Sequence, residues 1–184
     1  DAEAKAQAGV DLAFFGPDNR EGAKMVGMAL AKDLGSGAKV VILEGNPEAD
    51  NAKERKKGFD DAVAEGGLTL LDSKTAHWET EEANTLMTNF LTQYQDIQGV
   101  MAANDSMALG VVKALDATGL SGKIKVVGFD NIPAVQPLIR EGKMLATIDQ
   151  FGAQMAAMGI DYGLKELAGE TYSGWVKTEI KLIT

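Results

Sequence analysis

Hydrophobic positions in this chain follow two alternating patterns. Short, nearly continuous apolar runs occur at residues 10–15, 39–43, 68–71, 99–103, 124–129 and 144–148. Such runs are typical of strands that are buried on both faces, as in a parallel sheet. A last run, residues 175–183, alternates apolar and polar positions and predicts an edge or return strand.

Between these runs, apolar residues recur at the spacing of one face of an α-helix. Such stripes fall within residues 23–34, 83–91, 108–115 and 151–168. Residues suited to helix ends accompany them: Asp18 or Asn19, Thr80 and Asp105 as N-caps, Pro133 in a first turn, and Gly35, Gly119 and Gly142 at helix ends. The alternation predicts a doubly wound α/β fold with a mainly parallel sheet.

Composition changes this picture little but excludes several kinds of protein. A chain of 184 residues with 45% hydrophobic and 24% charged residues is long enough for a packed core without disulfides. Its net charge of −9 disfavours direct contact with the phosphates of nucleic acid. No apolar run reaches the ~18 residues expected of a membrane-spanning helix.

The chemistry-bearing residues are few. Cysteine is absent and His77 is the single histidine, which excludes thiol nucleophiles and Cys- or His-cluster metal sites. Neither a glycine-rich phosphate loop nor a G-x-S-x-G elbow is present. We therefore predict a protein that is not an enzyme, with no catalytic residues, no cofactor and no metal, and interpret His77 as a loop residue. An α/β enzyme is retained as an alternative hypothesis.

Ligands of doubly wound sheets bind beyond the carboxyl ends of the strands, so the residues that follow each strand are the candidates. They are residues 44–46, 74–78, 104–105, 130–131 and 149–150. For Asp105 a helix cap is the favoured interpretation, whereas for Asp130 a functional role is favoured. Trp78 either covers the sheet edge or forms a flat wall for a ligand.

A basic run, residues 52–59, stands out in this acidic chain. Most of its lysines fit a solvated helix face. Arg55 differs, because it falls near the predicted helix start and close to the strand ends. There its guanidinium can donate to two adjacent oxygens at once.

Four segments carry a resemblance to a known family: residues 55–59 (RKKGF), 103–110 (ANDSMALG), 126–131 (VVGFDN) and 142–150 (GKMLATIDQ). In this order they resemble the ribose-binding-protein-like type I periplasmic sugar-binding proteins of ABC importers. The same superfamily contains the effector domains of LacI-type transcription regulators.

The resemblance implies a set of ligand-binding residues. The family's bidentate arginine falls on Arg55, its sugar-stacking aromatic on Trp78, its hydroxyl-binding asparagine on Asn104, its carboxylate on Asp130 and its hinge glutamine on Gln150. The usual aromatic is phenylalanine, so Trp78 is a departure, and the ligand need not be ribose.

The implied function is binding of a monosaccharide or polyol in the periplasm and its delivery to the membrane permease of an ABC importer. The alternative is a sugar-sensing LacI-type effector domain. The turn at residues 119–123 and the C-terminal residues 179–184 resemble the transport proteins more closely.

Family members have two lobes joined by three crossings, with the sugar between the lobes. The resemblance therefore implies that residues 1–184 form one incomplete two-lobe protein, with the second lobe at residues 10–149. Residues 151–171 are expected to form a helix that packs on the absent first lobe, and residues 172–184 a return strand. We expect the apolar stripe of residues 151–168 to lie exposed and to favour self-association, unless the first lobe is supplied as a separate chain.

Overall fold

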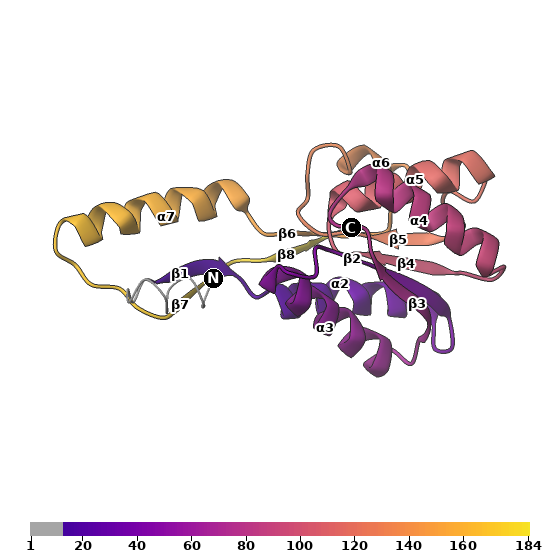
Figure 1. The fold of residues 1–184 in the computed structure, drawn as a ribbon, viewed down its shortest axis with the longest axis horizontal. Coiled ribbons are helices and arrows are strands. Elements are labelled where there is room, and N and C mark those ends of the chain that lie inside the picture. The colour runs from indigo at the N-terminus through magenta and orange to yellow at the C-terminus, as the bar shows by residue number, and fades with distance from the viewer. Residues whose placement is uncertain (1–12) are drawn as a thin grey trace.

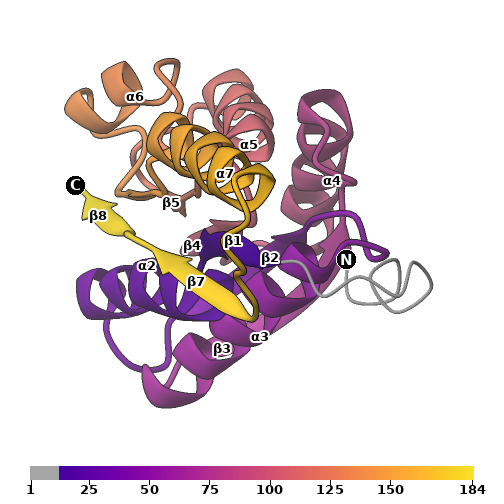
Figure 2. The same ribbon diagram turned by 90° about the vertical axis from the view of Figure 1, so that its left-hand side faces the viewer.

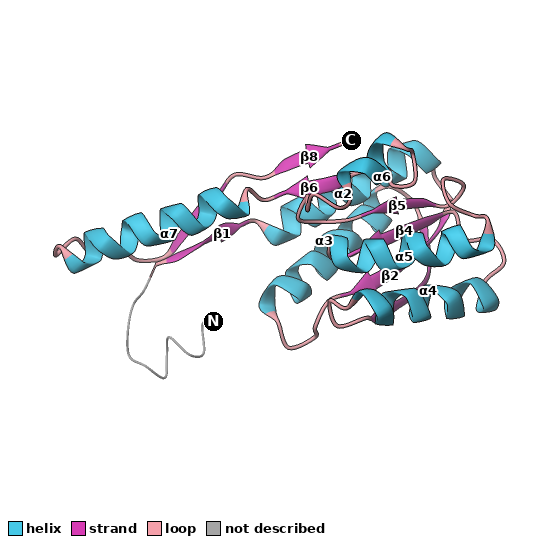
Figure 3. Ribbon diagram, turned by 90° about the horizontal axis from the view of Figure 1, so that it is seen from above, coloured by secondary structure: helices cyan, strands magenta, loops and turns pink. Residues whose placement is uncertain are grey.

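The computed structural model describes residues 13–184 and divides them into a compact lobe and a projecting arm (Figure 1). We call residues 18–149 the lobe. The arm consists of β1 (Phe14–Pro17), α7 (Gly152–Leu167) and β7 (Trp175–Thr178). The last strand, β8 (Lys181–Ile183), returns to the lobe (Figure 3). Residues 10–12 of the first predicted strand lie outside the described residues.

The lobe is built on a parallel sheet in the order β3-β2-β4-β5. These strands are β2 (Lys39–Glu44), β3 (Thr69–Thr75), β4 (Gly99–Ala102) and β5 (Lys125–Val127). Residues 144–149, which end in β6 (Thr147–Asp149), continue the sheet beside β5 through backbone bonds, and β8 pairs antiparallel with β6. The fold is thus mixed α/β with mainly parallel strands, as the sequence pattern predicts.

Helices cover both faces of this sheet. In Figure 1, α2 (Asn19–Leu34) and α3 (Asp50–Glu65) lie below it, and α4 (Thr80–Gln93) and α5 (Asp105–Thr118) lie above. The apolar stripes face inward, so that Leu30, Phe59, Phe90 and Leu115 have at most 1% of their surface exposed. Val40 to Leu43 of β2 are fully buried, as expected of a strand between two helical layers.

Some helix ends agree with the expectation and others differ from it. Asp18 caps α2, with its Oδ1 accepting from the Glu21 backbone N–H at 3.0 Å, and Gly35 and Gly119 end helices as predicted. The predictions for Thr80 and Asp105 are wrong, because each is the first helical residue and the N-caps are Glu79 and Asn104.

The short α6 (Gln136–Arg140) also differs from the expectation: Pro137, not Pro133, lies in its first turn, and Gly142 follows two residues after its end. The last predicted run is split as well, with β7 joining β1 and β8 joining β6.

Residues of the arm are much less buried than residues of the lobe. Figure 2, seen from the end of the arm, shows α7 and β7 standing in front of the lobe. No residue of α7 is buried, and Ile160, Leu164 and Leu167 are 61–86% exposed. The apolar stripe of residues 151–168 is therefore exposed, as the sequence predicts. Within residues 13–184, no helix combines the length and the apolar character needed to cross a membrane.

Candidate functional site

Arg55 is the centre of the candidate site. It lies in the second turn of α3 with only 4% of its surface exposed. Its Nη1 donates to the Ala103 carbonyl at 2.8 Å and to Asp130 Oδ1 at 3.4 Å, while its Nε donates to Asn19 Oδ1 at 2.9 Å. Three segments of the chain thus fix one guanidinium.

Two aromatic rings lie close to the same guanidinium. Its Cζ lies 3.7 Å from the centre of the Phe129 ring and 5.5 Å from that of Trp78, both within the range of cation–π attraction. Burial lowers the pKa of Arg55, and the Asp130 charge opposes this effect. An arginine stays protonated at any ordinary pH, so the site carries a fixed positive charge.

Asp130 faces this charge from the segment that follows β5. Its Oδ1 accepts from Gln150 Nε2 at 2.7 Å as well as from Arg55, and its side chain is 25% exposed. Burial raises the pKa of Asp130, while Arg55 acts in the opposite direction. Within residues 13–184 no hydrogen bond reaches Asp130 Oδ2, which leaves a carboxylate oxygen available as an acceptor.

Asn104 has one end fixed and the other free. Its Oδ1 caps α5 by accepting from the Met107 backbone N–H at 2.9 Å, which fixes the orientation of the amide. In the part of the chain that the structure describes, its Nδ2 donates to no partner. The amide therefore offers a donor beside Ala103, whose carbonyl accepts from Arg55.

Trp78 lies on a tightly built loop after β3. Both His77 and Trp78 have positive φ, 50° and 72°. The Thr75 hydroxyl donates to the Gly45 carbonyl at 2.7 Å and accepts from the His77 backbone N–H at 3.1 Å. A Cβ on Gly45 would lie 2.2 Å from the Trp78 ring, so glycine is needed there for the indole to lie flat against the backbone.

His77 itself points elsewhere. Its ring is half exposed, and its Nδ1 lies 2.7 Å from a carboxylate oxygen of Glu82. This agrees with the interpretation of His77 as a hydrogen-bonded loop residue.

Direct contacts join Arg55, Asp130, Gln150 and Trp78, and Asn104 adjoins them through Ala103. The five predicted residues therefore gather at the carboxyl-end edge of the sheet, with Arg55 and Asp130 on the same side. Sequence reasoning missed Asn19, which orients Arg55, and Phe129, which lies under its guanidinium. The signal for Asn19 is its place two residues after β1, at a strand end, where the sequence also allows a helix cap.

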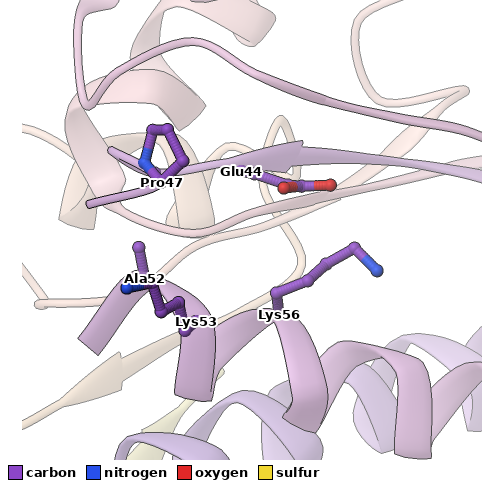
Figure 4. A pocket seen from close by; sticks show the side chains of 6 residues that line it. Glu44, Pro47, Ala52, Lys53 and Lys56 are labelled. Atoms are coloured by element: carbon purple, nitrogen blue, oxygen red, sulfur yellow. The ribbon is translucent and has the colours of Figure 1, made fainter. Parts of the chain in front are cut away.

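A cavity lies next to this cluster and not in it. It has a volume of about 220 Å³ and is lined by Glu44, Gly45, Pro47, Ala52, Lys53 and Lys56. Figure 4 shows Glu44 and Pro47 facing the α3 residues. Residues 13–184 contain no group of three or more His, Cys, Asp or Glu side chains placed to hold a metal ion.

Comparison with known proteins identifies relatives of this chain. The chain is 43% identical over 179 residues to the D-ribose/D-allose-binding protein of Pseudomonas aeruginosa, covering 95% of this chain and 56% of that protein. It is 37% identical to the ribose import binding protein RbsB of Escherichia coli, covering 97% of this chain and 60% of the relative.

A solved structure of a related protein has the same fold as this chain. An ABC transporter periplasmic solute-binding protein of Actinobacillus succinogenes, with bound D-allose, superposes with a TM-score of 0.94 at 37% identity, covering 100% of this chain and 64% of that one. The chain thus spans less than two thirds of the length of these relatives. The profile of the periplasmic binding protein domain matches residues 1–171, and the chain belongs to that family.

Proposed function

We propose that this chain binds a monosaccharide or polyol at the surface formed by Arg55, Trp78, Asn104, Asp130 and Gln150. The observation that carries the proposal is that Arg55 and Gln150 both donate to Asp130 Oδ1, while no donor among residues 13–184 reaches Oδ2. A carboxylate held in this way is an acceptor for sugar hydroxyls.

The remaining side chains suit the other hydroxyls of a sugar and the C–H face of its ring. Asn104 Nδ2 is a donor, and Gln150 Oε1 is an acceptor beside Asp130. The Trp78 ring is a flat apolar surface, suited to the C–H face of a pyranose or furanose ring. Because these polar groups are partly desolvated, an analogue that lacks a hydroxyl would leave one of them unpaired and would bind less tightly.

The names of the relatives guide the choice of ligand and of biological role. One is named for D-ribose and D-allose, another for ribose import, and a solved neighbour holds D-allose. We therefore propose D-ribose and D-allose as the first ligands to test. We also propose a periplasmic role in delivering sugar to the permease of an ABC importer. These names favour an importer over a LacI-type regulator.

The partners follow from the same proposal. The lobe would be the second lobe of a two-lobe binding protein; it begins later than the predicted range 10–149, because β1 pairs with β7 and belongs to the arm. The arm would pack on a first lobe or, without it, on a second copy of this chain. The five residues would then contact one side of the sugar only. We accordingly expect the chain alone to bind weakly, with a dissociation constant in the ~mM range.

Tryptophan fluorescence tests the site. The sequence has two tryptophans, so a Trp175→Phe background reports Trp78 alone. Titration with D-ribose or D-allose should change this emission, and Asp130→Asn should weaken the response by about tenfold. The matched control Asp60→Asn alters an exposed acid paired with Lys56 and should leave the response unchanged. No response of the Trp175→Phe protein at tens of millimolar sugar would contradict the proposal.

A further inference from the structure

Asp105 is a buried acid that the site described above does not use. It is fully buried at the first residue of α5, and it does not cap that helix, because Asn104 does. Its side chain turns instead toward two other segments, the loop that follows β5 and the strand β6.

The hydrogen bonds of Asp105 hold that loop at both ends. Its Oδ1 accepts from the Thr147 hydroxyl at 2.7 Å and its Oδ2 accepts from the Ile132 backbone N–H at 3.0 Å. Its own backbone N–H donates to the Phe129 carbonyl at 2.8 Å. Thr147 extends the contact, since its Oγ1 accepts from the Asn131 backbone N–H at 3.4 Å.

Gly128 provides the space for this carboxylate. A Cβ on Gly128 would lie 2.1 Å from Asp105 Oδ1, closer than any side chain permits. The glycine of the VVGFDN segment and the aspartate of the ANDSMALG segment are therefore two halves of one contact, although a whole helix and a strand separate them in the sequence.

The backbone between these anchors is strained. Asp130 has φ 115° and Asn131 has φ 53°, in a region that side-chain-bearing residues seldom adopt. Such conformations persist only where the surroundings fix them. The Asp130 conformation matters because it directs the carboxylate toward Arg55 and Gln150.

We propose that Asp105 is a positioning residue of the sugar site, which clamps residues 128–132 so that Asp130 presents its carboxylate beside Arg55. The inference rests on the proposed function of that surface. Asp105 acts through the loop and does not itself touch the sugar.

Burial disfavours the ionised form of Asp105, and its hydrogen bonds favour it. Burial raises its pKa to about 7; the bonds from Thr147 and Ile132 act against that rise, and the Asp130 charge adds to it. The charge of Asp105 also interacts with that of Arg55. A buried acid is costly to fold, and what offsets the cost here is the set of bonds that its two oxygens accept.

NMR spectroscopy of the chain tests the clamp with and without sugar. The variants are Asp105→Ala, which removes both acceptors, and Asp105→Asn, which keeps the shape and one acceptor. Asp116→Asn is the matched control, because Asp116 is an exposed acid on the same helix, paired with Lys143 at 3.0 Å. The readouts are the HN–Hα couplings of Asp130 and Asn131, which report φ, and the affinity for D-ribose and D-allose.

We expect Asp105→Ala to lose the positive-φ couplings and to bind sugar about tenfold more weakly, and Asp105→Asn to fall between it and wild type. Asp116→Asn should match wild type in both readouts. Folded Asp105 variants that are less stable but keep wild-type couplings and affinity would overturn the proposal, since Asp105 would then be structural only.

Two further variants decide the matter if Asp105→Ala does not fold. Thr147→Val removes one donor of the clamp, and Gly128→Ala displaces the carboxylate from its space, so both should move the same couplings. Unchanged couplings in both would overturn the proposal. If wild type binds no sugar while the couplings respond to Asp105, the proposed function fails and the clamp stands as a loop anchor only.

Discussion

The lobe and the arm carry similar sequence patterns but reach different degrees of burial. Helix α5 of the lobe buries Met107, Val111 and Leu115 completely, whereas α7 of the arm has a comparable apolar stripe and buries none of its residues. The difference lies in what each stripe packs against. Helix α5 lies on the four-stranded sheet, whereas among the described residues α7 lies beside the narrow β1–β7 ribbon. An amphipathic pattern therefore identifies an apolar face without identifying what covers it.

The junction between the two regions is where the candidate site lies. Asn19 follows β1 and Gln150 precedes α7, so two of the connections between arm and lobe end in side chains that hold Arg55 or Asp130. A third connection is the ion pair between Lys177 of β7 and Asp18, at 2.7 Å.

The largest expected contrast is a matched pair of leucine truncations. Leu30→Ala empties a fully buried position in the lobe and should lower the free energy of unfolding by about 3–4 kcal/mol. Leu164→Ala removes a side chain that is 61% exposed and should change it by less than about 0.5 kcal/mol. Urea denaturation measures both. A large effect of Leu164→Ala in dilute protein would mean that another surface covers the arm.

The second contrast concerns the pH dependence of the lobe. The pKa of Asp105 rises from 3.8 to about 7 on folding, so between these values the folded state holds more protons than the unfolded state. Stability therefore falls as pH rises. The wild-type free energy of unfolding, relative to that of Asp105→Asn, should drop by about 2 kcal/mol from pH 5 to pH 7.

The same urea titrations at several pH values measure this effect. The difference between the two proteins cancels the contribution of acids that do not interact with Asp105, among them Asp61 and Asp116, whose pKa values are lowered by ion pairs. Parallel curves for the two proteins would show that Asp105 ionises alike in the folded and unfolded states.

How much of the molecule is predictable from sequence also differs between the regions. In the lobe, the buried runs predict the order of strands and helices because each strand is covered on both faces and each stripe finds the sheet. The strand-end rule then predicts that Arg55 and Asp130 lie at one edge, because the carboxyl ends of parallel strands share that edge.

What the sequence does not predict depends on backbone geometry. The positive φ of Asp130 and Trp78 and the space that Gly128 leaves for Asp105 arise from contacts between segments distant in sequence. For the same reason the interpretation of Asp105 as a cap is wrong: an acid at a helix start fits the capping pattern, but the neighbouring Asn104 takes that position. In the last strand, the break between β7 and β8 reflects two different partners, which no local pattern encodes.

The third contrast is association. The arm exposes Ile160, Leu164 and Leu167 on α7, and Phe14 and Trp175 on its ribbon, so we expect concentration-dependent self-association of the chain. Leu164→Glu should weaken it by about tenfold, since the charge would have to be desolvated at the contact. Leu70→Glu, on an exposed lobe strand, is the control and should leave it unchanged. Sedimentation velocity distinguishes the two, and a wild-type chain that stays monomeric at high concentration would contradict the expectation.

The smallest contrast separates the two roles of Asp18, where lobe and arm meet. Its Oδ1 caps α2, and its Oδ2 accepts from Lys177 of the arm, which lowers the pKa of Asp18. Asp18→Ala removes both interactions and should cost about 1 kcal/mol of stability, most of it from the lost cap. Asp18→Asn keeps the cap and loses only a solvent-screened ion pair, so it should cost a few tenths, ~0.3 kcal/mol. Denaturation of both variants and of Lys177→Ala separates these effects. Equal losses in Asp18→Asn and Asp18→Ala would mean that the tie to the arm, and not the cap, is what Asp18 contributes.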